Sequence, residues 1–140
     1  MRYRKLRFDD LASLPKSPGI YQIHTNEGVA LKVGIAKNLY KRLRDHATSK
    51  QSRLKLKPGG CYSNPSDVQS KQSILAKHLY FDSSLDECYD LKTEKGRQQF
   101  LIERCHILFS ITCSREEARE LERDLEKSSS FRYVRHVLRQ

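Results

Sequence analysis

The stretch GIYQIHTNEGVALKVGI, residues 19–35, decides the fold prediction. Its two halves, residues 19–25 and residues 29–35, are rich in β-branched and aromatic side chains, which favour strands. Asn26-Glu27-Gly28 lies between them as a three-residue turn, with glycine where a positive φ is needed. The stretch therefore predicts a β-hairpin.

The register of this hairpin matters for the side chains that it presents. A simple register across a three-residue turn places Lys32 opposite Gln22 rather than Tyr21. Side chains on opposite faces of a sheet cannot meet, so Lys32 and Tyr21 can share a site only through a bulge or a diagonal contact.

The remaining segments predict helices and further strands. Asn38 is a suitable N-cap for an amphipathic helix, and Ser114 with Glu117 fits the capping box of a later one. Residues 49–66, rich in Ser, Lys, Pro and Gly, indicate a long loop. The predicted helices cover residues 38–48, 67–81, 93–104 and 114–127, a strand covers residues 106–112, and Arg4 to Phe8 is compatible with an edge strand.

These elements indicate one α/β domain over residues 1–140. We expect a small three-stranded, mainly antiparallel sheet flanked by helices, because a sheet and an amphipathic helix each have an apolar face to bury. The core of this domain is predicted at residues 19–48 and 106–127, and residues 49–105 are predicted to form a helical insertion.

The positive charge is concentrated in one part of the chain. There are 27 Lys and Arg against 17 Asp and Glu. Residues 1–57 hold 14 basic and 4 acidic side chains, whereas residues 58–140 hold 13 of each. Such a field attracts polyanions, above all nucleic acid. No apolar run approaches the roughly 18 residues of a membrane span, and no cysteine pair is spaced as CxxC, so we expect a cytoplasmic protein without a zinc site.

Four motif elements occur in a fixed order. Gly19-Ile20-Tyr21 is followed by Lys32-Val33-Gly34, then by a helix with Arg42 and His46, and finally by Ala118-Arg119-Glu120-Leu121-Glu122-Arg123-Asp124-Leu125. This order resembles the GIY-YIG nuclease superfamily, and most closely its restriction-enzyme-like members, which tolerate lysine at the second tyrosine. The resemblance covers residues 19–48 and 106–127. The chain departs from the family pattern at Lys32, at Ile35 and near Val134, where the family carries tyrosine, lysine in some members, and asparagine.

The resemblance implies a metal-dependent endonuclease that hydrolyses phosphodiester bonds in DNA. Glu122 would then be the ligand of Mg²⁺ or Mn²⁺, and Arg42 would clamp a phosphate. Tyr21 would act as general base or orient the attacking water, which requires positive charge to lower the pKa of its phenol. Lys32 would supply such charge or contact the phosphate, and His46 would relay a proton or hydrogen-bond the water.

Six basic residues outside these motifs are predicted to bind nucleic acid, with DNA preferred over RNA as the partner: Lys37, Lys41, Arg44, Arg53, Lys55 and Lys57. A homodimer or a separate specificity partner stays open. Two alternatives also stay open. One is a catalytically inactive nucleic-acid-binding module on the same fold. The other is a basic protein that acts through other proteins, with accidental motifs, and it predicts that Tyr21 and Glu122 lie far apart.

Overall fold

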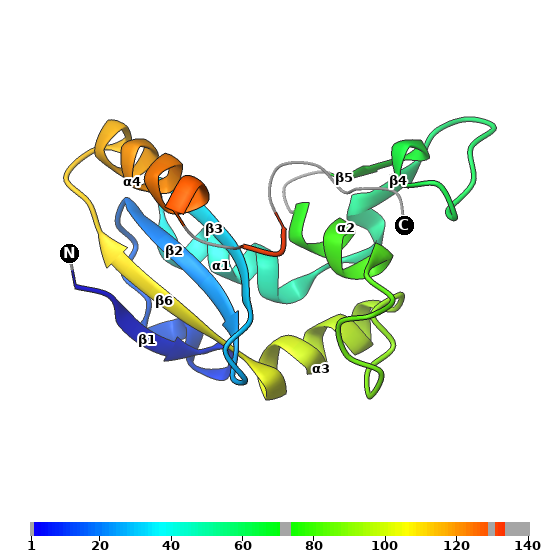
Figure 1. Cartoon of the computed structure of the whole chain (residues 1–140), viewed down its shortest axis with the longest axis horizontal. Coiled ribbons are helices and arrows are strands. Elements are labelled where there is room, and N and C mark those ends of the chain that lie inside the picture. The colour runs from blue at the N-terminus through cyan, green and yellow to red at the C-terminus, as the bar shows by residue number, and fades with distance from the viewer. Residues whose placement is uncertain (1, 71–73, 129–130, 134–140) are drawn as a thin grey trace.

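A four-stranded antiparallel sheet forms the centre of the molecule (Figure 1). The computed structural model describes residues 2–70, 74–128 and 131–133. The strand order is β1-β6-β2-β3. The strands cover Arg4–Arg7 for β1, Cys105–Ile111 for β6, Gly19–Thr25 for β2 and Ala30–Ala36 for β3. The predicted α/β fold with an antiparallel sheet is confirmed. The sheet has four strands rather than three, because β1 pairs with β6 along its whole length.

Helices cover both faces of the sheet. Side chains of β2 alternate between these faces, as the period of a strand requires. Tyr21 and Ile23 are buried in a cluster with α1 (Leu39–Thr48), α3 (Glu94–Arg104) and the short 3-10 helix η1 (Phe8–Ser13). Ile20 is buried on the opposite face, in a cluster that includes Leu121 and Leu125 of α4 (Arg115–Ser128). The sheet is therefore a layer between two helical layers.

Side chains cap the starts of three helices, two of them at the predicted residues Asn38 and Ser114. Asn38 accepts a hydrogen bond from the Lys41 amide at 3.0 Å and begins α1. Thr93 accepts one from Gly96 at the start of α3. At α4, Ser114 Oγ accepts from the Glu117 amide, and the Glu117 carboxylate accepts in turn from the amide of Cys113. The helices predicted at 38–48, 93–104 and 114–127 are thus confirmed.

The helix predicted at residues 67–81 is wrong in its first part. Residues Val68–Ser70 form a strand, β5, which pairs with β4 (Leu54–Leu56). The helix α2 covers Ile74–Phe81, and residues 71–73 of the predicted helix lie outside the described residues. Val68 is buried against Leu54, and this tertiary contact overrides the local helical pattern. Short 3-10 turns precede both strands, at Gln51–Arg53 (η2) and Pro65–Asp67 (η3). The β4–β5 pair and its loop extend away from the main sheet (Figure 1).

Residues 131–133 tie the edge of the sheet to the insertion. The amides of Arg132 and Tyr133 donate to the carbonyls of Ala30 and Leu31 in β3, at 2.9 and 2.8 Å. Both side chains also bind the buried carboxylate of Asp82, with Arg132 Nη2 donating at 2.9 Å and the Tyr133 hydroxyl at 2.7 Å. This short strap therefore fixes β3 relative to the end of α2. None of the described helices is long and apolar enough to cross a membrane.

Candidate active site

A bulge in β3 determines which side chains face the candidate site. The pairing of β2 with β3 shifts after His24 and Ala30, so Ile23 pairs with Lys32 instead of Leu31. Residues that face each other across a strand pair point to the same side of the sheet. Lys32 therefore lies on the Ile23 face, diagonal to Tyr21, and a bulge, one of the two arrangements considered in the sequence analysis, is present.

Tyr21 reaches the sheet edge by passing over a glycine. It pairs with Gly34, and an added Cβ at Gly34 would lie 2.5 Å from Cζ of the tyrosine and in contact with its hydroxyl oxygen. Only a residue without a side chain leaves room for the ring here. Tyr21 itself is fully buried, and its hydroxyl is hydrogen-bonded to Nε2 of His46 at 2.6 Å.

Helix α1 supplies two of the predicted residues. Arg42 and His46 lie one turn apart on the face of α1 that packs toward Tyr21. His46 is fully buried, and this burial, reinforced by the charges of Arg42 and Lys32, lowers the pKa of its imidazole well below 6.5. His46 is therefore neutral at neutral pH, with one ring nitrogen as donor and the other as acceptor.

The pKa of Tyr21 does not follow the sequence-based expectation. Burial raises it above 10.0, and the charge and hydrogen bonding of Arg42 oppose this rise without cancelling it. Arg42 therefore acts in the expected direction, but burial of the ring outweighs it, so the lowered pKa that a base role requires is not reached. Tyr21 is accordingly a neutral phenol at neutral pH. The pKa of Lys32 is lowered mainly by burial and next by the charge of Arg42, whereas the charge of Glu122 raises it.

Glu122 faces the same region from the other side of the sheet edge. It is half-buried on α4, next to Leu121, which packs against the sheet. Burial and the neighbouring Glu126 raise the pKa of its carboxyl group, and Lys32 opposes them. Among the described residues, none donates a hydrogen bond to this carboxylate or forms a close ion pair with it.

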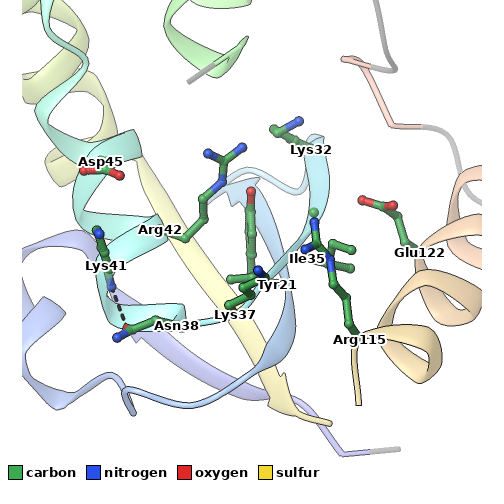
Figure 2. Close-up of a pocket in the computed structure, with 12 residues that line it drawn as sticks. Tyr21, Lys32, Ile35, Lys37, Asn38, Lys41, Arg42, Asp45, Arg115 and Glu122 are labelled. Carbon is green, nitrogen blue, oxygen red and sulfur yellow. Dashed lines mark hydrogen bonds between the residues drawn. The ribbon is translucent and has the colours of Figure 1, made fainter. Parts of the chain in front are cut away.

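A cavity of about 470 Å³ joins these groups (Figure 2). Tyr21, Lys32, Arg42 and Glu122 all line it, and His46 lies behind Tyr21. Figure 2 shows Arg42 of α1 and Glu122 of α4 on opposite sides of the Tyr21 ring. The position of β3 explains this arrangement, because an edge strand lets helices on both faces of a sheet reach one opening.

The residues predicted to bind nucleic acid divide into two groups. Lys37 and Lys41 line the cavity, whereas Arg44, Arg53, Lys55 and Lys57 do not. Arg44 lies over the ring of Tyr40 at 5.5 Å, and the other three belong to the segment that leads into and out of β4. The binding roles of all six stay predictions.

Two charged residues in the cavity were not predicted. Asp45 lies on α1, one turn after Arg42, and Arg115 lies in the first turn of α4. Helical spacing could have identified Arg115, because it is seven residues before Glu122 and therefore on the same face of its helix.

Comparison with known proteins gives one short sequence match. No protein-family model matches the chain. UvrABC system protein C from Chlorobium phaeobacteroides is 44% identical over 46 residues, which is 33% of this chain and 7% of that protein. The chain thus matches only a small part of this curated relative.

Solved structures similar to this chain include two point mutants of the GIY-YIG N-terminal endonuclease domain of UvrC from Thermotoga maritima, both described as bound to a catalytic divalent cation. Each is 18% identical, with a TM-score of 0.44, over 91% of this chain and 93% of that one. The short match to UvrC agrees with the resemblance to the GIY-YIG superfamily that the ordered motifs indicate.

Proposed function

We propose that this chain is a metal-dependent endonuclease of the GIY-YIG type that hydrolyses phosphodiester bonds in DNA. One observation carries the proposal. Tyr21, Lys32, Arg42 and Glu122 come from four different elements, and they line a single cavity. Accidental motifs give no reason for such convergence, and Tyr21 and Glu122 are not far apart as that alternative required.

The proposed proton path uses the hydrogen bond between Tyr21 and His46. Because burial raises the pKa of Tyr21, its phenol holds its proton before reaction. His46 is neutral, so Nε2 can accept that proton while the phenol oxygen accepts one from the attacking water. In this tautomer the resting imidazole carries its hydrogen on Nδ1, and after transfer it is a cation.

Arg42 and Lys32 would stabilise the phosphate. Negative charge develops on the phosphate oxygens as water attacks, and preorganised cations stabilise it without having to reorient. The guanidinium of Arg42 can make two parallel hydrogen bonds to a phosphate. Lys32 is aimed into the cavity by the bulge in β3, where it provides a second positive charge.

Glu122 fits the role of a metal ligand. A half-buried carboxylate with no hydrogen-bond donor among the described residues is poorly compensated for its burial, and a cation would compensate it. The described residues contain no cluster of three or more acidic, histidine or cysteine side chains. This fits Mg²⁺, which binds through one or two carboxylates and keeps several waters. When bound, such an ion would supply positive charge beside the scissile phosphate.

Nicking of a supercoiled plasmid tests the proposal. We expect cleavage with Mg²⁺ or Mn²⁺ and none with EDTA. Glu122→Gln and Arg42→Ala should each lower the rate by at least about a hundredfold, as losses of transition-state stabilisation do. Glu120→Gln removes the same charge from an exposed position on the same helix and should cut normally. Normal cutting by Glu122→Gln would contradict the assignment.

The inactive binding module is the second candidate. The pKa values favour it in one respect, because a protonated Tyr21 and a weakly basic His46 leave no strong base at neutral pH. Salt-sensitive binding of DNA without nicking in any divalent cation would support this candidate. Nicking that requires Glu122 would exclude it.

A further inference from the structure

Arg115 is a cavity residue that the proposed chemistry does not use. It lies in the first turn of α4 and lines the cavity together with Tyr21 and Glu122. Its side chain is exposed, and within the described ranges it makes no hydrogen bond or ion pair. Figure 2 shows it extending from the start of α4 toward Ile35.

Arg115 is poorly explained as a stabilising residue of its own helix. The first turn of a helix carries a partial positive charge, so a cation there is unfavourable. The other side chains of this turn follow the expected preference, since Glu116 and Glu117 are acidic. An arginine that faces a cavity from this position therefore indicates a ligand rather than a contribution to folding.

Arg115 and the proposed metal ligand Glu122 lie at different points along α4. Seven residues place Arg115 about 10 Å from Glu122 along the helix axis, measured between backbone positions. Both residues project from the same face of the helix. Arg115 is therefore positioned to reach a different part of a bound ligand from the part at Glu122.

The charges around Arg115 support an extended anion. The other lysines that line the cavity besides Lys32 are Lys37, just after β3, and Lys41, on the first turn of α1. The acidic groups that face the cavity are Asp45 and Glu122. Among the described residues, Lys32 and Arg42 bring the cations that line the cavity to five against two carboxylates, an excess beyond what one singly charged phosphodiester needs.

We propose that Arg115 and Lys37 form a second phosphate subsite, which binds the phosphate next to the scissile one in the same DNA strand. This inference rests on the proposed function and names a residue that sets the position of the substrate. A guanidinium is suited to it because its planar fork matches two phosphate oxygens. The subsite would hold the strand in register while Tyr21 and Glu122 act on the scissile bond.

Neutral phosphate analogues test the inference directly. Duplexes that include the cleavage site, each with one phosphate replaced by an uncharged methylphosphonate, are compared for binding by fluorescence anisotropy in EDTA. We expect Arg115→Ala to weaken binding of the unmodified duplex about tenfold and to reduce the slope of log K against log salt by about one. Arg119→Ala, an exposed arginine outside the cavity on the same helix, is the matched control and should change binding much less.

The decisive readout is the coupling between protein and DNA changes. Neutralising one phosphate adjacent to the scissile one should weaken binding of the wild type more than binding of Arg115→Ala, because the variant keeps only the Lys37 contact to that phosphate. The subsite would be overturned if the effects of Arg115→Ala and of phosphate neutralisation on the binding free energy were additive at every position. It would also be overturned if Arg115→Ala lost no more affinity than Arg119→Ala. If the wild type nicks plasmid while the subsite test fails, the proposed function still holds. If wild type neither binds nor nicks DNA, the proposed function fails and the subsite with it. An unchanged thermal melt of Arg115→Ala excludes a folding effect.

Discussion

Replacing Gly34 with alanine is the most direct test of how Tyr21 reaches the cavity. The added Cβ would lie 2.5 Å from Cζ of Tyr21, a separation that packed atoms do not adopt. The ring is fully buried and is held by its hydrogen bond to His46, so it cannot move without losing that bond. Gly34→Ala should therefore damage both stability and activity.

The size of the stability loss follows from two contributions. Overpacking of a well-filled core costs about 1–3 kcal/mol. A buried hydroxyl displaced from its partner costs about 1–3 kcal/mol more. We therefore expect Gly34→Ala to lower the free energy of unfolding by about 2–6 kcal/mol, a large part of the stability of an ordinary domain. Urea denaturation followed by circular dichroism measures this directly.

A second variant separates the clash from a general effect of alanine in the strand. The leucine side chain in Tyr21→Leu lacks Cε1, Cζ and the hydroxyl, which are the atoms that the new Cβ would contact. In that background Gly34→Ala should cost less than about 1 kcal/mol. An equal cost in both backgrounds, or a cost below about 1 kcal/mol in the wild type, would refute the proposed role of Gly34.

Three further outcomes are expected from buried polar groups. The unfolded chain binds a proton at His46 below pH 6.5, and the folded protein does not. The contribution of His46 to stability therefore falls by about 1.4 kcal/mol per pH unit as the pH drops below 6.5. In urea titrations at several pH values, His46→Gln should reduce this dependence of stability on pH. Arg97 is fully buried and donates to the carbonyls of Ser49 and Leu91, so Arg97→Met should cost about 1–3 kcal/mol for each carbonyl left without a donor, measured by the same assay. Burial opposes ionisation of Asp82, but hydrogen bonds, led by that from Arg132, outweigh burial and lower its pKa to about 2. Asp82→Asn should therefore destabilise the protein at pH 7. The difference in melting temperature between wild type and variant should shrink as the pH falls from 4 toward 2, because the wild-type carboxylate becomes protonated.

The hairpin and the capped helices could be predicted from local sequence because local chemistry dominates there. Residues 19–35 combine two runs rich in β-branched and aromatic side chains with a glycine-containing turn, and Asn38, Thr93 and Ser114 bind amides at the starts of their helices. The convergence of Tyr21, Arg42 and Glu122 on one cavity followed from recognising the motif order. Their catalytic roles remain predictions.

The bulge could not be placed from the sequence, because it is determined by packing. In a simple register Val33 would face α1, whereas the shift turns it toward Ile20 and the α4 layer. The same register shift therefore buries Val33 on the α4 side and turns Lys32 toward the opposite face. The β4–β5 pair, and the strap formed by Arg132 and Tyr133, depend on contacts between distant residues in the same way.

The strand order has a consequence for synthesis on the ribosome. Both β1 and β2 hydrogen-bond to β6, which begins only at Cys105. Until that strand has emerged, β1 has no neighbour and β2 has one open side, so the sheet cannot close. Glu122 follows later still. A partly synthesised chain could therefore carry the hairpin and α1 but could not assemble the complete cavity on which the proposed cleavage depends.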